Sequence, residues 1–320
     1  MPDTFFTASP DWTIYIVPYF FVGGIAGGSY FLAAMLHWIG RPEDQGIARL
    51  GYVVAFVGAV LSGLLLIVDL GQPLRFWHML FQSERFPLPI LKAWSPMSVG
   101  SWALLLFGAF ATASALGALA YEDRLRFRPL RLFYEGMPGR IIALLGAACG
   151  FFIASYTGVL LNVTNRPIWA DTTWLGVLFL VSAASTAAAT LMLIARWRMN
   201  AGGEHPTVAW LAWFDGWVLV IELVLITIFL VSLGEVSRVW LSWRGVALLL
   251  LVVLLGIIIP LVLHFRPIWV RERWRTHRVV AGAVLVLIGG FFLRFITLVS
   301  SETIHGPHTG IQGPHVGLWP

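Results

Sequence analysis

Long apolar runs separated by short polar segments fill most of this sequence. A membrane-spanning helix needs roughly 20 mostly apolar residues, because hydrocarbon offers an exposed backbone amide no hydrogen-bond partner. Eight runs meet that length, and they predict helices at residues 12–38, 48–70, 96–119, 139–161, 172–197, 209–233, 242–265 and 279–300. The pattern therefore predicts an all-α integral membrane protein with eight transmembrane helices. We expect one membrane domain over residues 1–320, arranged as two four-helix bundles.

The composition agrees with this interpretation. Of the 320 residues, 58% are hydrophobic and 12% are charged, whereas about a quarter of the residues of a soluble domain are charged. The mean hydropathy is +0.82. No basic segment or small-residue cleavage site precedes the first apolar run, so we expect that run to be kept as a helix and not removed as a signal peptide.

The basic residues predict the orientation of the chain. A net charge of +5 would suggest nucleic acid in a soluble protein, but loop arginine and lysine set the orientation of a membrane protein. Loops one, three, five and seven, with their flanks, hold fourteen arginines: Arg41, Arg49, Arg124, Arg126, Arg128, Arg131, Arg140, Arg196, Arg198, Arg266, Arg271, Arg273, Arg275 and Arg278. The opposite loops hold six basic residues: Arg75, Arg85, Lys92, Arg166, Arg238 and Arg244. We therefore expect cytoplasmic arginine-rich loops and both termini outside.

Three charged residues fall deep within the predicted helices. An ionisable group inside a membrane is expensive and is a functional hypothesis by default. At 1.5 Å per residue, Glu222 and Arg294 lie about 20 and about 22 Å from the inner face, so they can form an ion pair. Asp215 lies two helical turns before Glu222 on the same face. These residues form either a pair that fixes helix register or a proton relay.

A second set of polar residues is expected near the outer face. Tyr19 lies about 10 Å below that face, Tyr156 lies about 25 Å from the inner one, and Asp69 ends the second helix. Arg75, His78 and Lys92 follow in the next loop. A quinone ring needs aromatic walls, a hydrogen-bond donor to each carbonyl and a nearby acid or histidine, so this layer is a candidate quinone site. The alternative is ordinary interfacial placement of tyrosine and a water-facing aspartate.

Other redox groups fit the sequence less well. The single cysteine, Cys149, cannot hold an iron–sulfur cluster by itself, and we interpret it as a small buried apolar residue. No pair of histidines falls deep within helices; His37 and His264 are expected at cytoplasmic helix ends, which disfavours a mid-membrane haem. The tail containing His305, His308 and His315 is expected to extend over a partner subunit, with a metal site as the alternative.

Several segments resemble one known family. They are Asp69 to Leu80, Ser95 to Trp102, Tyr19 with residues 23–28, Ser155 to Leu161, Asn165 to Trp169 and Gly289 to Arg294. Together they resemble the NrfD-like family, the quinone-interacting membrane subunits typified by polysulfide reductase. The resemblance spans nearly the whole chain.

The resemblance implies a haem-free anchor in a bacterial inner membrane, with a quinol site that opens toward the outer face. It implies menaquinone or ubiquinone as the cofactor, a ferredoxin-like partner with four-iron clusters, and a molybdopterin or multihaem cytochrome c catalytic subunit. The chain would be part of an oxidoreductase complex and inactive alone. The contact residues implied for the ring are Tyr19 and Tyr156.

We assign candidate roles on this basis. Asp69 and His78 exchange protons at the ring, and Glu222 with Arg294 forms a buried relay. The candidate ring contacts are Tyr19, Tyr156, Arg75, Trp77, Asn162 and Arg166, with Arg75 stabilising a reduced anion. Two other functions stay open: a transporter or proton-translocating subunit, suggested by the charges at depth, and a purely structural anchor.

Overall fold

The computed structural model describes residues 15–81, 89, 91–92, 94–164, 166, 168–199, 205–265 and 275–301, without the side chains of residues 235, 238, 239, 275 and 276. Within these residues the protein is helical apart from turns, loops and an isolated β-bridge between Phe81 and Pro89. Eight spans in the described part are long and apolar enough to cross a membrane. The predicted all-α membrane fold with eight spans is confirmed.

The spans run in the order α1 (Ile16–Ile39), α2 (Gln45–Asp69), α3 (Pro96–Tyr121), α4 (Gly136–Asn162), α5 (Leu175–Met199), α6 (Pro206–Ser232), a seventh span from Trp243 to Phe265, and α9 (Arg275–Ser300). Short 3-10 helices lie between spans: η2 (Pro42–Asp44), η3 (Pro73–Met79), η5 (Arg128–Phe133) and η6 (Gly234–Leu241). The observed ends lie close to the expected ones; the last span, expected from Val279, begins at Arg275. The expected start of the first helix at Trp12 lies outside the described residues.

The seventh span differs from the single helix expected at residues 242–265. It consists of α7 (Trp243–Ala247), a π-helical middle η7 (Leu248–Ile258) and α8 (Ile259–Phe265). Pro260 follows the π-helix and has no N–H to donate to the preceding turn. Gly256 of η7 approaches α9 so closely that a Cβ on it would lie 2.5 Å from the Cα of Gly289. An apolar run is compatible with either helix type, so the pattern alone does not reveal the change.

Small residues set the close contacts of α1. A Cβ on Gly27 would lie 2.4 Å from the carbonyl oxygen of Gly150 in α4, and a Cβ on Gly28 would lie 2.6 Å from that of Ala183 in α5. Small residues let membrane helices pack backbone to backbone, where lipid removes most of the hydrophobic drive for association. The packing role expected for the glycines of the first helix is confirmed at these two positions.

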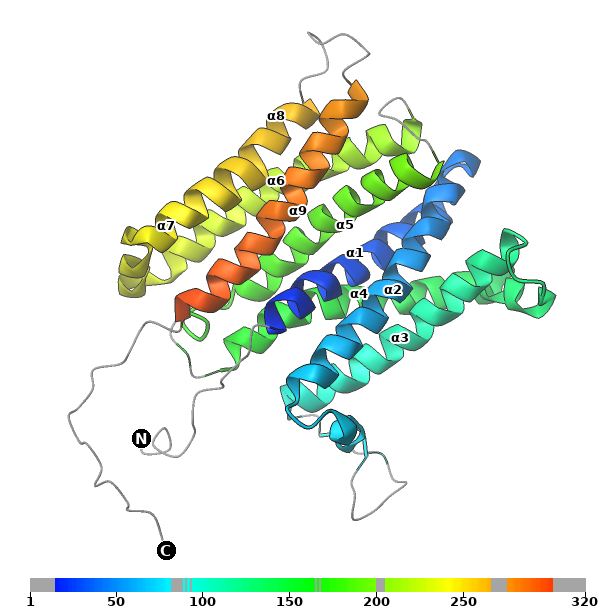
Figure 1. Ribbon diagram of the computed structural model, residues 1–320, viewed down its shortest axis with the longest axis horizontal. Helices are drawn as coiled ribbons and strands as arrows, with labels where there is room; N and C mark the ends of the chain where they lie inside the picture. Colours follow the sequence, from blue (N-terminus) through cyan, green and yellow to red (C-terminus); the bar gives the residue numbers. More distant parts are fainter. Residues whose placement is uncertain are drawn as a thin grey trace, which may run out of the picture.

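The helices contact one another in a continuous network. α1 packs against α2, α4 and α5; α3 packs against α2 and α4; and α9 packs against α5, η7 and α8. Figure 1 shows α1, α4 and α5 side by side in the middle of the molecule. Because α1 and α4 both contact α5, the helices form one connected body, and a division into two four-helix bundles stays a prediction.

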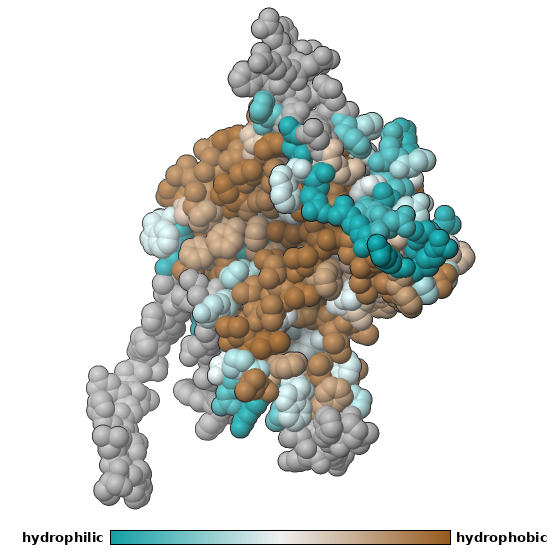
Figure 2. Space-filling model, turned by 45° about the vertical axis from the view of Figure 1, so that its right-hand side comes forward, coloured by the Kyte–Doolittle hydropathy of each residue, from teal (hydrophilic) through white to brown (hydrophobic). Residues whose placement is uncertain are grey.

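The two ends of the helical body differ in charge. α1 begins and α9 ends at the same end, which we call the terminal end (Figure 1). The opposite end, the arginine-rich end, carries the described arginines of loops one, three and five. Figure 2 shows hydrophobic residues covering the middle of one face and hydrophilic residues gathered toward its ends. Large apolar side chains such as Val57, Leu61 and Leu64 are exposed on α2, as expected for helices surrounded by lipid. The protein is a multi-pass membrane protein; which end faces the cytoplasm stays a prediction, and the histidine-containing tail lies outside the described residues.

Candidate functional site

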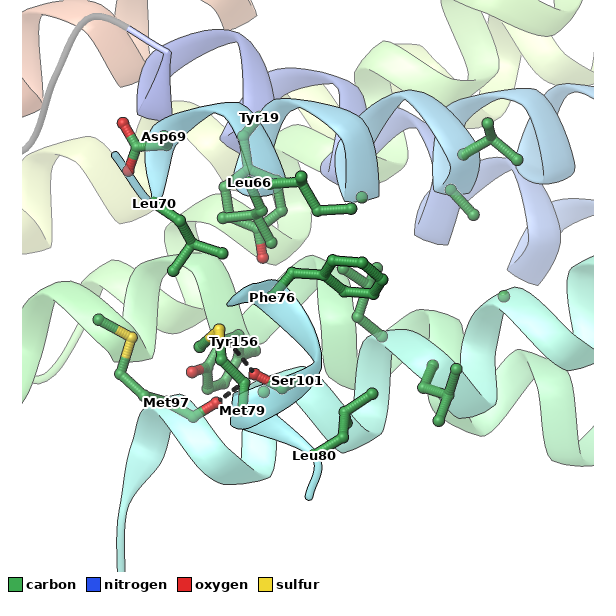
Figure 3. Close-up of a pocket in the computed structure, with 18 of the residues that line it drawn as sticks. Tyr19, Leu66, Asp69, Leu70, Phe76, Met79, Leu80, Met97, Ser101 and Tyr156 are labelled. Atoms are coloured by element: carbon green, nitrogen blue, oxygen red, sulfur yellow. Dashed lines mark hydrogen bonds between the residues drawn. The ribbon is translucent and has the colours of Figure 1, made fainter. Parts of the chain in front are cut away.

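A pocket of about 710 Å³ lies between α2 and α3 and reaches α1 and α4 toward the terminal end. Its polar side chains are Tyr19, Asp69, Ser101, Thr112 and Tyr156, and the other lining residues are apolar or glycine. This volume falls within the range of about 300–1,000 Å³ that is usual for small-molecule pockets, which are also mostly apolar with a few polar groups. Tyr19, Asp69 and Tyr156, expected in one outer layer, therefore line one pocket (Figure 3).

Tyr19 enters the pocket from the first turn of α1. Its side chain is 3% exposed, and Figure 3 shows its hydroxyl directed into the pocket, toward the side where Phe76 and Tyr156 lie. Gly23 follows one turn later and leaves space beside the ring, since a Cβ there would lie 3.8 Å from Tyr19 Cε2. The ring is thus held by helix packing with its polar end toward the pocket.

Tyr156 enters from α4 and is bound to the start of α3. Its hydroxyl donates a hydrogen bond of 2.5 Å to the carbonyl oxygen of Pro96, and its ring stacks on Phe152 with 5.5 Å between centroids. Gly100 makes this position possible, because a Cβ at residue 100 would lie 2.2 Å from the Tyr156 hydroxyl oxygen. Beside it, Ser101 donates to the Met97 carbonyl at 2.9 Å. Tyr156 therefore has a fixed orientation before any ligand binds.

Asp69 is the last residue of α2, where the backbone turns over the pocket. Gly71 has a φ of +66°, a left-handed conformation that glycine adopts without a Cβ penalty. The turn leads into η3, from which Phe76 and Met79 line the pocket, together with Leu80 directly after it. The carboxylate of Asp69 thus lies half-buried between α2 and the cover formed by η3.

The other candidates on η3 lie at its outer side. Arg75 and His78 are exposed and Trp77 is half-buried, and none of the three is among the described residues that line the pocket. The rings of Trp77 and His78 pack together with 3.8 Å between centroids. Lys92 is also exposed, and its backbone N–H donates to Ser98 Oγ at 3.2 Å near the start of α3. The structure therefore places these four residues around the mouth of the pocket region and not within it.

Asn162 and Arg166 belong to the loop between α4 and α5. With its amide nitrogen facing them, Asn162 donates to the carbonyls of Trp169 and Thr172, both at 3.1 Å. The Arg166 guanidinium lies over the Trp169 ring at 5.4 Å, and Trp169 Nε1 donates to the Thr297 carbonyl of α9 at 2.9 Å. Both residues thus surround a buried tryptophan that ties this loop to α9, and neither lines the pocket.

Arg294 of α9 is fully buried and joins three helices. Nε donates to the Phe20 carbonyl of α1 at 3.2 Å, and Nη2 donates to the Phe179 carbonyl of α5 at 3.3 Å. Nη1 donates to Ser182 Oγ at 3.1 Å and to its own helix at Gly290. A Cβ on Gly24 would lie 2.9 Å from Nη2, so this glycine leaves room for the guanidinium.

Two buried carboxylates lie along α6 beside this arginine. Glu222 faces Ser182 and interacts electrostatically with Arg294, so the serine hydroxyl connects the acid to the guanidinium. Two turns earlier, Asp215 Oδ1 accepts a 2.5 Å hydrogen bond from Ser185, and Oδ2 lies 3.4 Å from Nδ1 of His264. Neither nitrogen of His264 has a hydrogen-bond partner among the described residues.

Sequence reasoning missed several residues of these two clusters. His264 is the next-to-last residue of α8, but its side chain is fully buried against Asp215. Ser182 and Ser185 were not singled out, although a polar residue in an apolar helix is a usable signal. Gly100 gave no sequence signal, because its role is the space it leaves for a ring from another helix.

Comparisons with known proteins agree with the resemblance described above. The family described as polysulphide reductase, NrfD matches residues 4–305. The C chain of polysulfide reductase from Wolinella succinogenes is 28% identical over 313 residues, which make up 92% of this sequence and 95% of that protein. Protein NrfD of Escherichia coli is 26% identical over 91% of this sequence and 94% of its own length. The C subunit of selenate reductase from Mesobacillus selenatarsenatis is 28% identical over 101 residues, 32% of this sequence and 21% of that protein.

Proposed function

Because this chain belongs to the NrfD family of polysulphide reductase membrane subunits, we propose that it is the quinone-binding anchor of a multi-subunit respiratory oxidoreductase. The observation that carries the proposal is the convergence of Tyr19, Asp69 and Tyr156 on one mostly apolar pocket near the terminal end. When bound, a quinol supplies electrons to an iron–sulfur partner and protons to nearby acids. We expect menaquinone or ubiquinone as the ligand.

The residues of the pocket fit an amphipathic ring. Phe76, Met79 and Met97 give apolar walls, and the Tyr19 hydroxyl is a donor directed into the space between them (Figure 3). Tyr156 presents a second hydroxyl oxygen in a fixed place, because its proton is already donated to the Pro96 carbonyl. Asp69 holds or releases a proton at its carboxylate, half-exposed at the end of α2. The pocket thus supplies a donor, an acceptor and an acid within one apolar wall.

The proposed roles differ in how directly the residue reaches the pocket. His78 and Arg75 lie on the outer side of η3, so we propose them for proton passage between Asp69 and water and for the local positive charge at the mouth. Trp77 packs on His78 and orients its ring. Asn162 and Arg166 are left out of the proposed ring contacts, because they surround Trp169 in the neighbouring loop.

We further propose a buried relay through Glu222, Ser182 and Arg294. The Arg294 guanidinium donates to the carbonyl of Phe20, the residue next to Tyr19. Asp215 and His264 extend this buried polar series toward the arginine-rich end. The same cluster favours a second candidate function, proton translocation by the subunit. Proton uptake into liposomes by the purified subunit without its partners would favour translocation over the quinol anchor.

The partners and orientation are part of the same proposal. Both termini and the pocket mouth face outward in a bacterial inner membrane, with the arginine-rich end in the cytoplasm, as loop arginines predict. A ferredoxin-like subunit with four-iron clusters docks at the terminal end, close to the pocket, and a molybdopterin or multihaem cytochrome c protein completes the assembly. Relatives that carry the names of polysulfide and selenate reductase support this arrangement.

Binding of a fluorescent quinone analogue to the purified complex tests the site. We expect saturable quenching with the wild-type complex and about tenfold weaker binding for Tyr19→Phe, since a lost hydrogen bond in an apolar site costs about 1–3 kcal/mol. Tyr15→Phe is the matched control, because Tyr15 is 45% exposed and precedes α1. A complex that binds no analogue would support the purely structural anchor.

A further inference from the structure

The pocket continues far beyond its polar end. From Asp69 its lining follows α2 back to Phe56, and from Met97 it follows α3 to Thr112. Thirteen residues separate Phe56 from Asp69, which corresponds to about 20 Å of helix at 1.5 Å per residue. The space is therefore a groove along two neighbouring helices, with the polar groups Tyr19, Asp69 and Tyr156 gathered at one end.

The long part of the groove is apolar and open on one side. Its walls include Phe56, Val60, Leu104, Leu105 and Ala109. Val60 is 46% exposed and Leu105 is 48% exposed on the membrane-facing surface. A groove with such flanks, on a helix pair that spans the membrane, is in contact with the lipid hydrocarbon along its length.

Two glycines give the groove its depth. Gly63 of α2 and Gly108 of α3 both line it, and a Cβ on either would meet no atom within 4 Å. They differ in this from Gly27 and Gly28, where a Cβ would collide with a neighbouring helix. Gly63 and Gly108 therefore serve no helix contact and leave empty space in the wall of the groove.

We propose that this groove binds the polyisoprenoid tail of the quinone whose ring lies at the Tyr19, Asp69 and Tyr156 end. The inference rests on the proposed function and adds to it that the natural ligand is a long-tailed quinone. A single ligand with a polar ring and a long apolar tail matches the two parts of the cavity. A phospholipid matches them poorly, because no described residue lining the cavity is basic and the Asp69 carboxylate would face the phosphate.

Bulky residues in the groove test this proposal in the assembled complex in proteoliposomes. We expect Gly63→Phe and Gly108→Phe to raise the KM for a long-tailed quinol about tenfold, as occlusion of a hydrophobic subsite does. The KM for decylquinol, whose tail is short, should stay near the wild-type value. Leu106→Phe is the matched control, because Leu106 is exposed on α3 and does not line the groove.

The outcomes are distinguishable. An equal rise of KM for both quinols, or no rise for either, would overturn the tail site. Competition by added phospholipid against the long-tailed quinol would assign the groove to lipid acyl chains and also overturn it. A wild-type complex that oxidises neither quinol would contradict the proposed function and the tail site with it. The smaller variant Gly63→Leu and the melting temperature of each complex separate occlusion from misfolding.

Discussion

Changing Asp69 to asparagine is expected to lower quinol-dependent turnover of the assembled complex about 100-fold, because a positioned acid or base contributes about 10²–10⁴-fold. Asparagine has nearly the same shape but cannot accept the proton that leaves a quinol. Asp69 lines the pocket at the end of α2, so its loss should change the chemistry and leave the fold intact. The measurement is electron transfer from a quinol to an artificial acceptor in membranes that contain the complex.

Controls define what the Asp69 result means. Glu43→Gln removes a carboxylate at the arginine-rich end, far from the pocket, and should leave turnover unchanged. Asp69→Glu keeps the acid and should recover part of the activity. Tyr156→Phe should also lower turnover, because it removes the oxygen that lies against Pro96. Wild-type turnover in both Asp69→Asn and Tyr156→Phe would remove this site assignment.

Replacing Arg294 by methionine is expected to destabilise the subunit by about 3 kcal/mol, as found when one partner of a buried charge pair is removed. The substitution removes donors to α1 and α5 and leaves Glu222 buried without its guanidinium. The measurement is thermal unfolding of the purified complex in detergent. Arg294→Lys should be intermediate, because lysine keeps the charge but not the planar fork of donors.

A double substitution separates the two causes of that loss. If the uncompensated Glu222 carboxylate is the main cost, Arg294→Met combined with Glu222→Gln should be more stable than Arg294→Met alone. An Arg294→Met complex that melts at the wild-type temperature would mean that the arginine contributes little to stability. Loss of turnover without loss of stability would then point to the relay.

The spans could be predicted because their signal is local. A run of about 20 apolar residues needs a helix wherever it lies in the sequence, and all eight appear close to their expected ends. The π-helix η7 could not be predicted, since it depends on the contact of Gly256 with Gly289 in another helix. Helix identity is thus encoded nearby, whereas its fine geometry is set by tertiary contacts.

The candidate site divides in the same way. Depth along each helix brought Tyr19, Asp69 and Tyr156 to one level, and packing then turned all three toward one pocket. Arg75, Trp77 and His78 have the right depth, but the orientation of η3 directs Phe76 and Met79 inward instead. His264 was expected at a helix end, and only the position of α6 beside α8 makes it a buried partner of Asp215.

The contact between Arg294 and the carbonyl of Phe20 has a mechanical consequence. Tyr19 and Phe20 are consecutive, so a single peptide unit carries both the ring that enters the pocket and the oxygen that α9 grips. A rotation of α1 that withdraws the tyrosine must also stretch the arginine contact. A load applied to the last helix, for instance by a docked subunit, is thereby transmitted to the pocket over one residue.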